Sequence, residues 1–186
     1  MTPRLHLRLL GDCQITFDQT GFDQARVDLP LAKARALLAY LAVSGRVEPR
    51  GALVDLLWSE LGEADARRNL RVVLTQLRQA LGDYITATRT TVSFQRDHPH
   101  WLDVERLVAG AQRQRATQTT VLSPGEAEQL AQCFALYQGD FLRGLEVHNA
   151  PIRRCIGCAD PVAGCFTGEA VFDARAVGHG QLRRRQ

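Results

Sequence analysis

Lysine is nearly absent from this chain, because Lys33 is its only lysine whereas lysine and arginine together number 23. GC-rich arginine codons explain this bias more simply than function does. The single lysine forms no G-x-x-x-x-G-K-[ST] phosphate loop, and the chain also has no H-E-x-x-H zinc motif. It has no glycine-rich dinucleotide fingerprint after a strand and no G-x-S-x-G nucleophile elbow. We therefore expect no enzymatic activity and no cofactor.

Long hydrophobic runs are also missing. Nowhere do 18 apolar residues follow one another, so no transmembrane span is expected. Arg4 and Arg8 interrupt the apolar N-terminal stretch, which therefore does not read as a signal peptide. The five cysteines are an odd number in a chain without an export signal, and this favours a reducing compartment over a disulfide framework. These features predict a cytoplasmic protein without a membrane partner.

The rest of the composition is that of a soluble globular protein. The chain has 186 residues, of which 45% are hydrophobic and 23% charged, enough for one buried core or for a small domain and part of a second. Its formal net charge of +3 is only mildly basic. Any case for nucleic-acid binding must therefore come from where the charges lie.

Periodicity predicts an α+β winged helix-turn-helix domain over residues 1–100. A small antiparallel N-terminal sheet is expected from strands at 5–10, 13–18 and 25–30. Helical spacing then covers 31–44, with Gly45 as a stop, and 49–58, with Pro49 in its first turn. A third helix spans 64–81. The alternating stretch 84–95, with a turn at 88–90, predicts a β-hairpin wing.

The third helix has a basic face. At 100° per residue, one side is formed by Ala66, Leu70, Val73, Leu74, Leu77, Ala80 and Leu81. The opposite side carries polar and basic side chains without an acid, namely Arg67, Arg68, Arg71, Thr75, Arg78 and Gln79. A solvated face is one interpretation of such a run. The other is DNA binding, because surface helices usually mix charges in i,i+4 pairs that are missing here, and because Arg and Gln read base edges.

Three stretches resemble the bacterial transcriptional activation domain family, which is related to the Streptomyces antibiotic regulatory proteins. They are "LPLAKARALLAYLAVSGR", "LVDLLWSELGEADARRNLRVVLTQLRQALGDYI" and "YQGDFLRGL". The similarity extends from Leu5 to Asn149, and residues 31–83 are its most specific part. The family carries an OmpR/PhoB-type winged helix followed by a helical, tetratricopeptide-like activation domain.

The resemblance implies that residues 64–81 form the recognition helix in the DNA major groove. Val72 and Gln76 lie on the flank of its basic face, and Asn69 is read as structural. Arg89 at the hairpin tip would reach the adjacent minor groove. Trp58 and Trp101 are expected to be packing residues. The implied partners are double-stranded DNA and RNA polymerase, with tandem dimers on directly repeated sites.

A partial all-α tetratricopeptide-like domain is expected over residues 101–150. The domain would begin near "WLDVERL", where Leu102, Val104, Leu107 and Val108 start its first helix. Residues 113–122 would be a linker, and "SPGE" (Ser123 to Glu126) would start the next helix through a capping box.

Residues 151–186 depart from the family pattern, with no sustained period and three of the five cysteines. We interpret this segment as an irregular or non-native tail. The alternative is a zinc site formed by Cys155, Cys158 and Cys165, with His179 as a further candidate ligand. One C-x-x-C pair followed by a single cysteine and a distant histidine matches known zinc spacings poorly. We therefore expect no metal.

The sequence as a whole predicts a sequence-specific DNA-binding transcriptional regulator, expected to be an activator, that reads DNA with helix 64–81. The alternative is a winged-helix and helical-repeat module that binds protein and not DNA. The basic face argues against that alternative.

Overall fold

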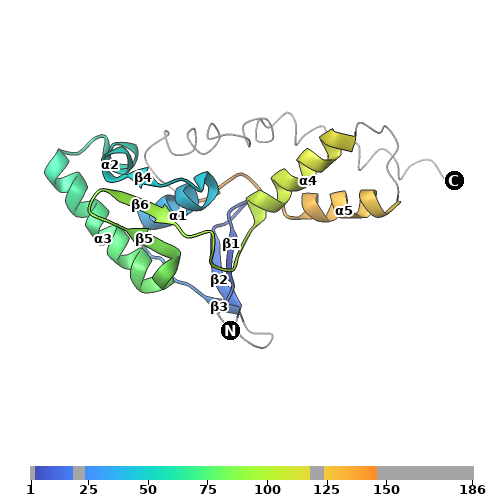
Figure 1. Cartoon of the computed structure of the whole chain (residues 1–186), viewed down its shortest axis with the longest axis horizontal. Helices are drawn as coiled ribbons and strands as arrows, with labels where there is room; N and C mark the ends of the chain where they lie inside the picture. The colour runs from blue at the N-terminus through green and yellow to red at the C-terminus, as the bar shows by residue number, and fades with distance from the viewer. Residues whose placement is uncertain (1–2, 19–23, 118–123, 146–186) are drawn as a thin grey trace.

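The computed structural model describes residues 3–18, 24–117 and 124–145. Two small β-sheets and three helices form one end of the molecule, and two further helices lie side by side at the other end (Figure 1). The elements are β1 (Leu5–Arg8), β2 (Gln14–Asp18), β3 (Gln24–Arg26), α1 (Ala32–Ser44), β4 (Glu48–Pro49), α2 (Arg50–Trp58), α3 (Glu63–Leu81), a 3-10 turn η1 (Gly82–Tyr84), β5 (Ile85–Ala87), β6 (Thr91–Phe94), β7 (His100–Leu102), α4 (Asp103–Thr117) and α5 (Pro124–Ala135).

The N-terminal sheet is mixed rather than antiparallel throughout. Its strand order is β3-β2-β1-β7, and the first three strands pair antiparallel as expected. Strand β7 pairs in parallel with β1, with Leu5 opposite His100 and Leu7 opposite Leu102. The sequence did not reveal β7 because three residues are too few to show a period of two, and its partner lies about 95 residues away. The prediction of a purely antiparallel sheet was therefore wrong.

Helices α1 and α2 form at the places that periodicity predicts. Leu37, Leu38 and Leu41 of α1 are fully buried. Gly45 ends α1 in the left-handed conformation, with φ 60°, and donates its N–H to the Leu41 carbonyl at 3.0 Å, which is the usual role of glycine at this position. Pro49 precedes α2, whose last residue, Trp58, is buried. The prediction that Trp58 is a packing residue is confirmed.

The predicted hairpin is confirmed as β5–β6, and a further strand that was not predicted pairs with it. The two-residue strand β4 pairs with β6, with Glu48 opposite Val92, so the sheet order is β4-β6-β5. The segment between α1 and α2 is thereby fixed to the hairpin. Three helices followed by a hairpin in this order are compatible with a winged helix.

Helix α3 is amphipathic and packs against α1, α2 and β5. It begins at Glu63, one residue before the expected start, and acidic side chains in its first turn favour the positive end of the helix dipole. Gly82 follows its last residue with φ 57° and donates its N–H to the Arg78 carbonyl, a conformation that glycine adopts without a steric penalty. Its buried side is formed by Ala66, Leu70, Val73, Leu74, Leu77 and Leu81.

The hydrophobic core continues across position 101. Leu102, Val104 and Leu107 belong to the same buried cluster as the leucines of α1 and α3. Buried Asp103 is the first residue of α4. Its Oδ1 accepts the N–H of the next residue, Val104, at 2.8 Å, while Oδ2 accepts the Leu9 and Leu10 N–H groups at 2.7 and 2.9 Å. Desolvation by burial raises the pKa of this carboxyl, and the three N–H donors act in the opposite direction. Asp103 thus joins α4 to the residues that directly follow β1.

Two predictions about the second half need correction. Helix α4 starts at Asp103 and not at Leu102, because Leu102 is the last residue of β7. Trp101 also lies in β7 and stacks on His6 with ring centroids 5.4 Å apart. The expected linker at 113–122 is helical as far as Thr117. Its Gln and Arg residues have high helix propensity, so a polar composition alone does not end the helix. Trp101 is a packing residue, as expected.

The chain after α5 returns to the N-terminal sheet. Leu10 forms a β-bridge with Phe141, and the Leu142 N–H donates to the Leu9 carbonyl at 2.8 Å. Residues 151–186, with Cys155, Cys158 and Cys165, lie outside the described residues. Among the residues that are described, no three His, Cys, Asp or Glu side chains gather as a metal site. None of the described helices is long and apolar enough to span a membrane.

Candidate nucleic-acid interface

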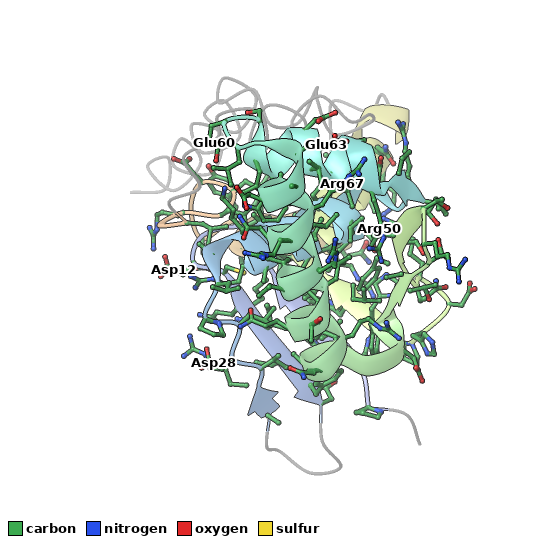
Figure 2. The ribbon with its side chains drawn as sticks, turned by 90° about the vertical axis from the view of Figure 1, so that its left-hand side faces the viewer. Asp12, Asp28, Arg50, Glu60, Glu63 and Arg67 are labelled. Atoms are coloured by element: carbon green, nitrogen blue, oxygen red, sulfur yellow. The ribbon has the colours of Figure 1, made fainter. Side chains whose placement is uncertain are left out.

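The predicted basic face of α3 is solvent-exposed along its whole length. Figure 2 views the molecule onto this helix, with labelled Arg67 and Arg50 on the hairpin side and Glu60, Asp12 and Asp28 on the other. The labelled Glu63, in the first turn of α3, lies beside Arg67 on the hairpin side. Every side chain expected on the basic face is exposed, namely Arg67, Arg68, Arg71, Thr75, Arg78 and Gln79.

One arginine of this face has an acidic partner, contrary to the prediction. Arg67 forms an i,i+4 ion pair with Glu63, which the expected helix start at Ala64 had left in the preceding loop. Both side chains are largely exposed, at 63% and 73%, so the pair is weak and easily exchanged. Arg68, Arg71 and Arg78 have no side-chain hydrogen bond or ion pair to any described residue.

The flank of the face is partly apolar. Val72 is 51% exposed and is one of four large hydrophobic side chains exposed among the described residues. Gln76 and Asn69 are half-buried. The Gln76 Oε1 atom is buried without a hydrogen-bond partner in the described part of the chain. Val72 can thus meet a surface beside the arginines, whereas Gln76 and Asn69 lie nearer the core.

The hairpin presents Arg89 on a well-ordered turn. The Thr88 Oγ1 accepts the N–H groups of Thr90 and Thr91 at 3.2 and 3.0 Å and lies 2.8 Å from the Thr91 hydroxyl. The Thr88 N–H also donates to the Thr91 carbonyl at 2.9 Å. Arg89 lies inside this turn and is exposed. The tip is thus held by its own threonines while the arginine stays free to reach outward.

An open groove of about 1010 Å³ separates the second half of α3 from the hairpin. Arg71, Thr75, Arg78 and Gln79 contribute to it from α3, so four of the predicted site residues share one concave surface. The remaining lining residues come from α2, the end of α3, the hairpin and the segment after it, and are Arg50, Leu74, Gly82, Asp83, Ile85, Thr86, Ala87, Gln95 and His98.

Arg50 is the member of this groove that sequence reasoning missed. It is the first residue of α2, so no periodicity within α3 could include it. Its backbone N–H donates to the Thr90 carbonyl at 2.8 Å, beside the hairpin tip. The signal that could have found it is a basic residue directly after the short β4 segment, at the point where a helix starts under the hairpin.

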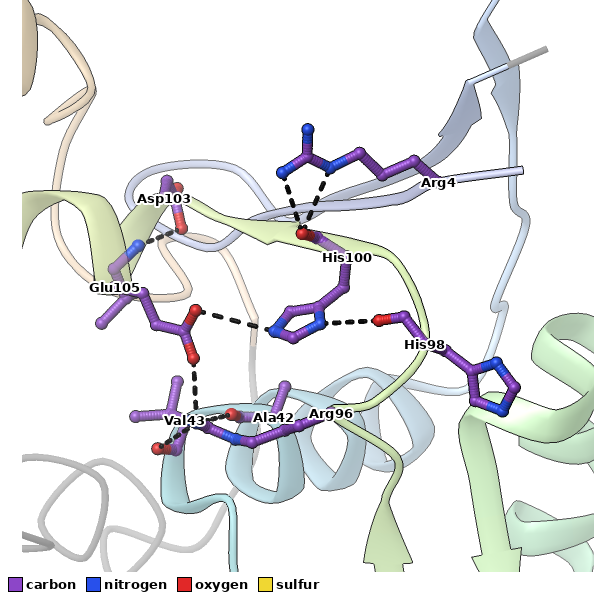
Figure 3. A network of polar contacts seen from close by, with 9 residues as sticks. Arg4, Ala42, Val43, Arg96, His98, His100, Asp103 and Glu105 are labelled. Atoms are coloured by element: carbon purple, nitrogen blue, oxygen red, sulfur yellow. Dashed lines mark hydrogen bonds and ion pairs between the residues drawn. The ribbon is translucent and has the colours of Figure 1, made fainter. Parts of the chain in front are cut away.

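A polar network fixes the segment that leaves the hairpin (Figure 3). Arg96 donates to the Ala42 carbonyl at 2.8 Å, near the end of α1, and pairs with Glu105 of α4 at 3.0 Å. The His100 ring lies 3.6 Å from the same carboxylate, and Arg4 donates to the His100 carbonyl. The hairpin, α1 and α4 are therefore connected by charged groups as well as by the core.

Comparison with solved structures shows what this chain is similar to. EmbR from Mycobacterium tuberculosis, in a structure of its complex with a low-affinity phosphopeptide, has a TM-score of 0.60 and 24% sequence identity to this chain. The match covers 94% of this chain and 45% of EmbR, so the chain spans less than half the length of that protein. No family model and no curated protein matches the sequence. The chain accordingly shares the fold of the matched part of EmbR.

Proposed function

We propose that this protein is a sequence-specific DNA-binding regulator of transcription, in which α3 enters the major groove and the β5–β6 hairpin acts as a wing. The observation that carries the proposal is the exposed row of arginines on α3, most of them without partners, beside a hairpin with an exposed arginine at its tip. Like charges on one helix repel each other, and a polyanion removes that repulsion.

The dimensions of α3 suit this role. Nineteen residues at 1.5 Å each make a helix about 28 Å long, and the major groove, about 12 Å wide, admits one helix. Arginine contacts to phosphates would fix the register, while base contacts would supply the sequence preference. Arg71 and Arg78 are suited to guanine or phosphate, and Gln79 to adenine. Arg67, Arg68 and Thr75 complete the surface, and Arg89 would enter the minor groove.

The family resemblance extends the proposal beyond DNA binding. It supports an activator that occupies directly repeated sites as a tandem dimer and recruits RNA polymerase. Helices α4 and α5, which pack against each other, would then be the first pair of a tetratricopeptide-like activation domain. The fold shared with EmbR supports the architecture alone. The phosphopeptide bound by EmbR has no part in the proposal, because less than half of EmbR is matched.

A binding-site selection tests the proposal. The complete chain is incubated with a pool of duplexes carrying a randomised 30-base-pair segment, and bound duplexes are amplified and sequenced over several rounds. We expect enrichment of one motif, in two copies about one helical turn apart if tandem binding occurs. The Arg68→Gln/Arg71→Gln/Arg78→Gln variant should enrich none, whereas the exposed α4 control Arg106→Gln should match the unmodified chain. A folded chain that enriches no sequence would instead favour the protein-binding alternative.

A further inference from the structure

Arg50 lies where two DNA-facing elements meet. Residues 48–49 form β4 and pair with β6, and the Arg50 N–H is bonded to the Thr90 carbonyl. The backbone of Arg50 is therefore fixed to the hairpin near its tip. Figure 2 shows the residue between α3 and the hairpin, and it lines the same groove as Arg71 and Arg78.

The side chain of Arg50 has no partner of its own. The residue is half-buried, and its Nε is enclosed without a hydrogen bond to any described residue. An enclosed donor on a charged group is unfavourable unless an acceptor is supplied. Asp83 is the one carboxylate residue of the groove lining, whereas three arginines line it, and no ion pair joins Asp83 to any of them in the described part of the chain. The groove therefore has an excess of positive charge.

An external anion in the groove would pair with the part of this guanidinium that the half-buried side chain leaves exposed. A solvated arginine would keep its whole guanidinium in water, and a structural arginine would bond a carboxylate or carbonyl, yet Arg50 does neither. A guanidinium whose backbone is already held in place loses little further freedom when it binds, and it matches a phosphate with two parallel N–H donors. Since the hairpin and α3 would contact DNA on either side of Arg50, the anion that fits is a phosphate of the DNA backbone.

We propose that Arg50 is a further DNA-contacting residue, which binds one backbone phosphate between the recognition helix and the wing and so fixes the register of both. This inference rests on the proposed function. It adds a contact from α2, outside the recognition helix. That contact would position the protein on the DNA and would not contribute to its sequence preference.

The first test compares Arg50→Ala with Arg106→Ala, which removes one exposed charge from α4, in binding to the selected duplex and to a scrambled one. We expect Arg50→Ala to weaken both complexes by about tenfold and to reduce the slope of log K against log salt by about one. Arg50→Lys should restore the slope, because it keeps the charge. Unchanged binding by Arg50→Ala, or a loss confined to the selected sequence, would overturn the inference.

A second measurement locates the phosphate. Single phosphates of the selected duplex are replaced in turn by neutral methylphosphonates, and binding is measured for the unmodified chain and for Arg50→Ala. We expect one position at which neutralisation weakens the unmodified chain but has no effect on Arg50→Ala. If no position shows this, Arg50 contacts no phosphate. If the unmodified chain binds no duplex at all, the proposed function fails, and that result is distinct from failure of the Arg50 contact.

Discussion

At the scale of single residues, the buried Asp103 side chain accepts three backbone N–H groups, two from Leu9 and Leu10 after β1 and one from Val104 in α4. Asp103→Ala would leave the Leu9 and Leu10 N–H groups buried without these acceptors and remove the side-chain acceptor of the Val104 N–H in the first turn of α4. We expect the free energy of unfolding to fall by about 3 kcal/mol, measured by urea denaturation. Asp97→Ala, at an exposed carboxylate, should change it little, and equal effects would contradict the assignment.

The two arginines in the groove should differ in what they contribute. If Arg71 reads a guanine, Arg71→Ala should weaken binding by about 1–3 kcal/mol and relax the preference at one base pair. If Arg78 contacts a phosphate, Arg78→Ala should weaken all duplexes alike and reduce the salt slope by about one. Competition binding against a panel of single-base variants separates the two effects. Wild-type affinity in both variants would mean that this face of α3 is only solvated.

The Cys13 thiol should be unreactive in the folded chain. Burial raises its pKa to about 11, although nearby Arg35 lowers it somewhat. The thiolate is the reactive form, and at pH 8 only about one molecule in a thousand would carry it at this site. Iodoacetamide labelling at pH 8, read by peptide mass mapping, should therefore modify Cys13 slowly in buffer and rapidly in urea. Equal rates in the two conditions would show that the thiol is accessible.

At the scale of elements, segments with a sustained period or a clear turn signal could be predicted, including the short strands β3 and β5, whereas β4 and β7 could not. Helix α3 has an apolar side of six buried residues and a glycine after its last turn. Both features can be recognised from the sequence of the helix itself. Strands β4 and β7 have two and three residues, and pairings with distant partners define them. The same limit explains why Arg50 was missed, because it joins the groove through β4. Glu63 was missed for a local reason, since the helix begins one residue earlier than expected.

The hairpin tip provides a test at this scale. Arg89 projects from a turn held by Thr88, so it can enter a minor groove without disturbing the sheet. Arg89→Ala should lower the affinity for duplexes whose flanking segment is A·T-rich more than for those with a G·C-rich flank, since a narrow A·T minor groove attracts arginine most. The thermal midpoint should not change. An equal loss of affinity for duplexes with A·T-rich and G·C-rich flanking segments would indicate that Arg89 contacts phosphates and not the minor groove.

At the scale of the whole molecule, the buried hydrophobic side chains of the described residues form one core. The stability of a shortened chain therefore depends on which of these side chains it keeps. Leu102, Val104, Leu107, Leu142 and Leu145 are buried in the same cluster as the leucines of β1 and α1. A fragment of residues 1–101 loses all of them, together with Asp103, whereas a fragment of residues 1–145 keeps them. We expect the shorter fragment to be less stable by several kcal/mol, as measured by its urea midpoint. Equal midpoints would show two independent units.

The central claim is that unpaired arginines on and beside α3 bind the DNA backbone, and the salt dependence of binding tests it most directly. Affinity of the complete chain for its selected duplex is measured by fluorescence anisotropy from about 50 to 200 mM salt, with the Arg68→Gln/Arg71→Gln/Arg78→Gln variant alongside. We predict a loss of roughly two orders of magnitude over this range for the unmodified chain. The slope should be about 0.9 smaller for each phosphate contact that the variant has lost. Salt-independent binding, or equal slopes for the two proteins, would contradict the account.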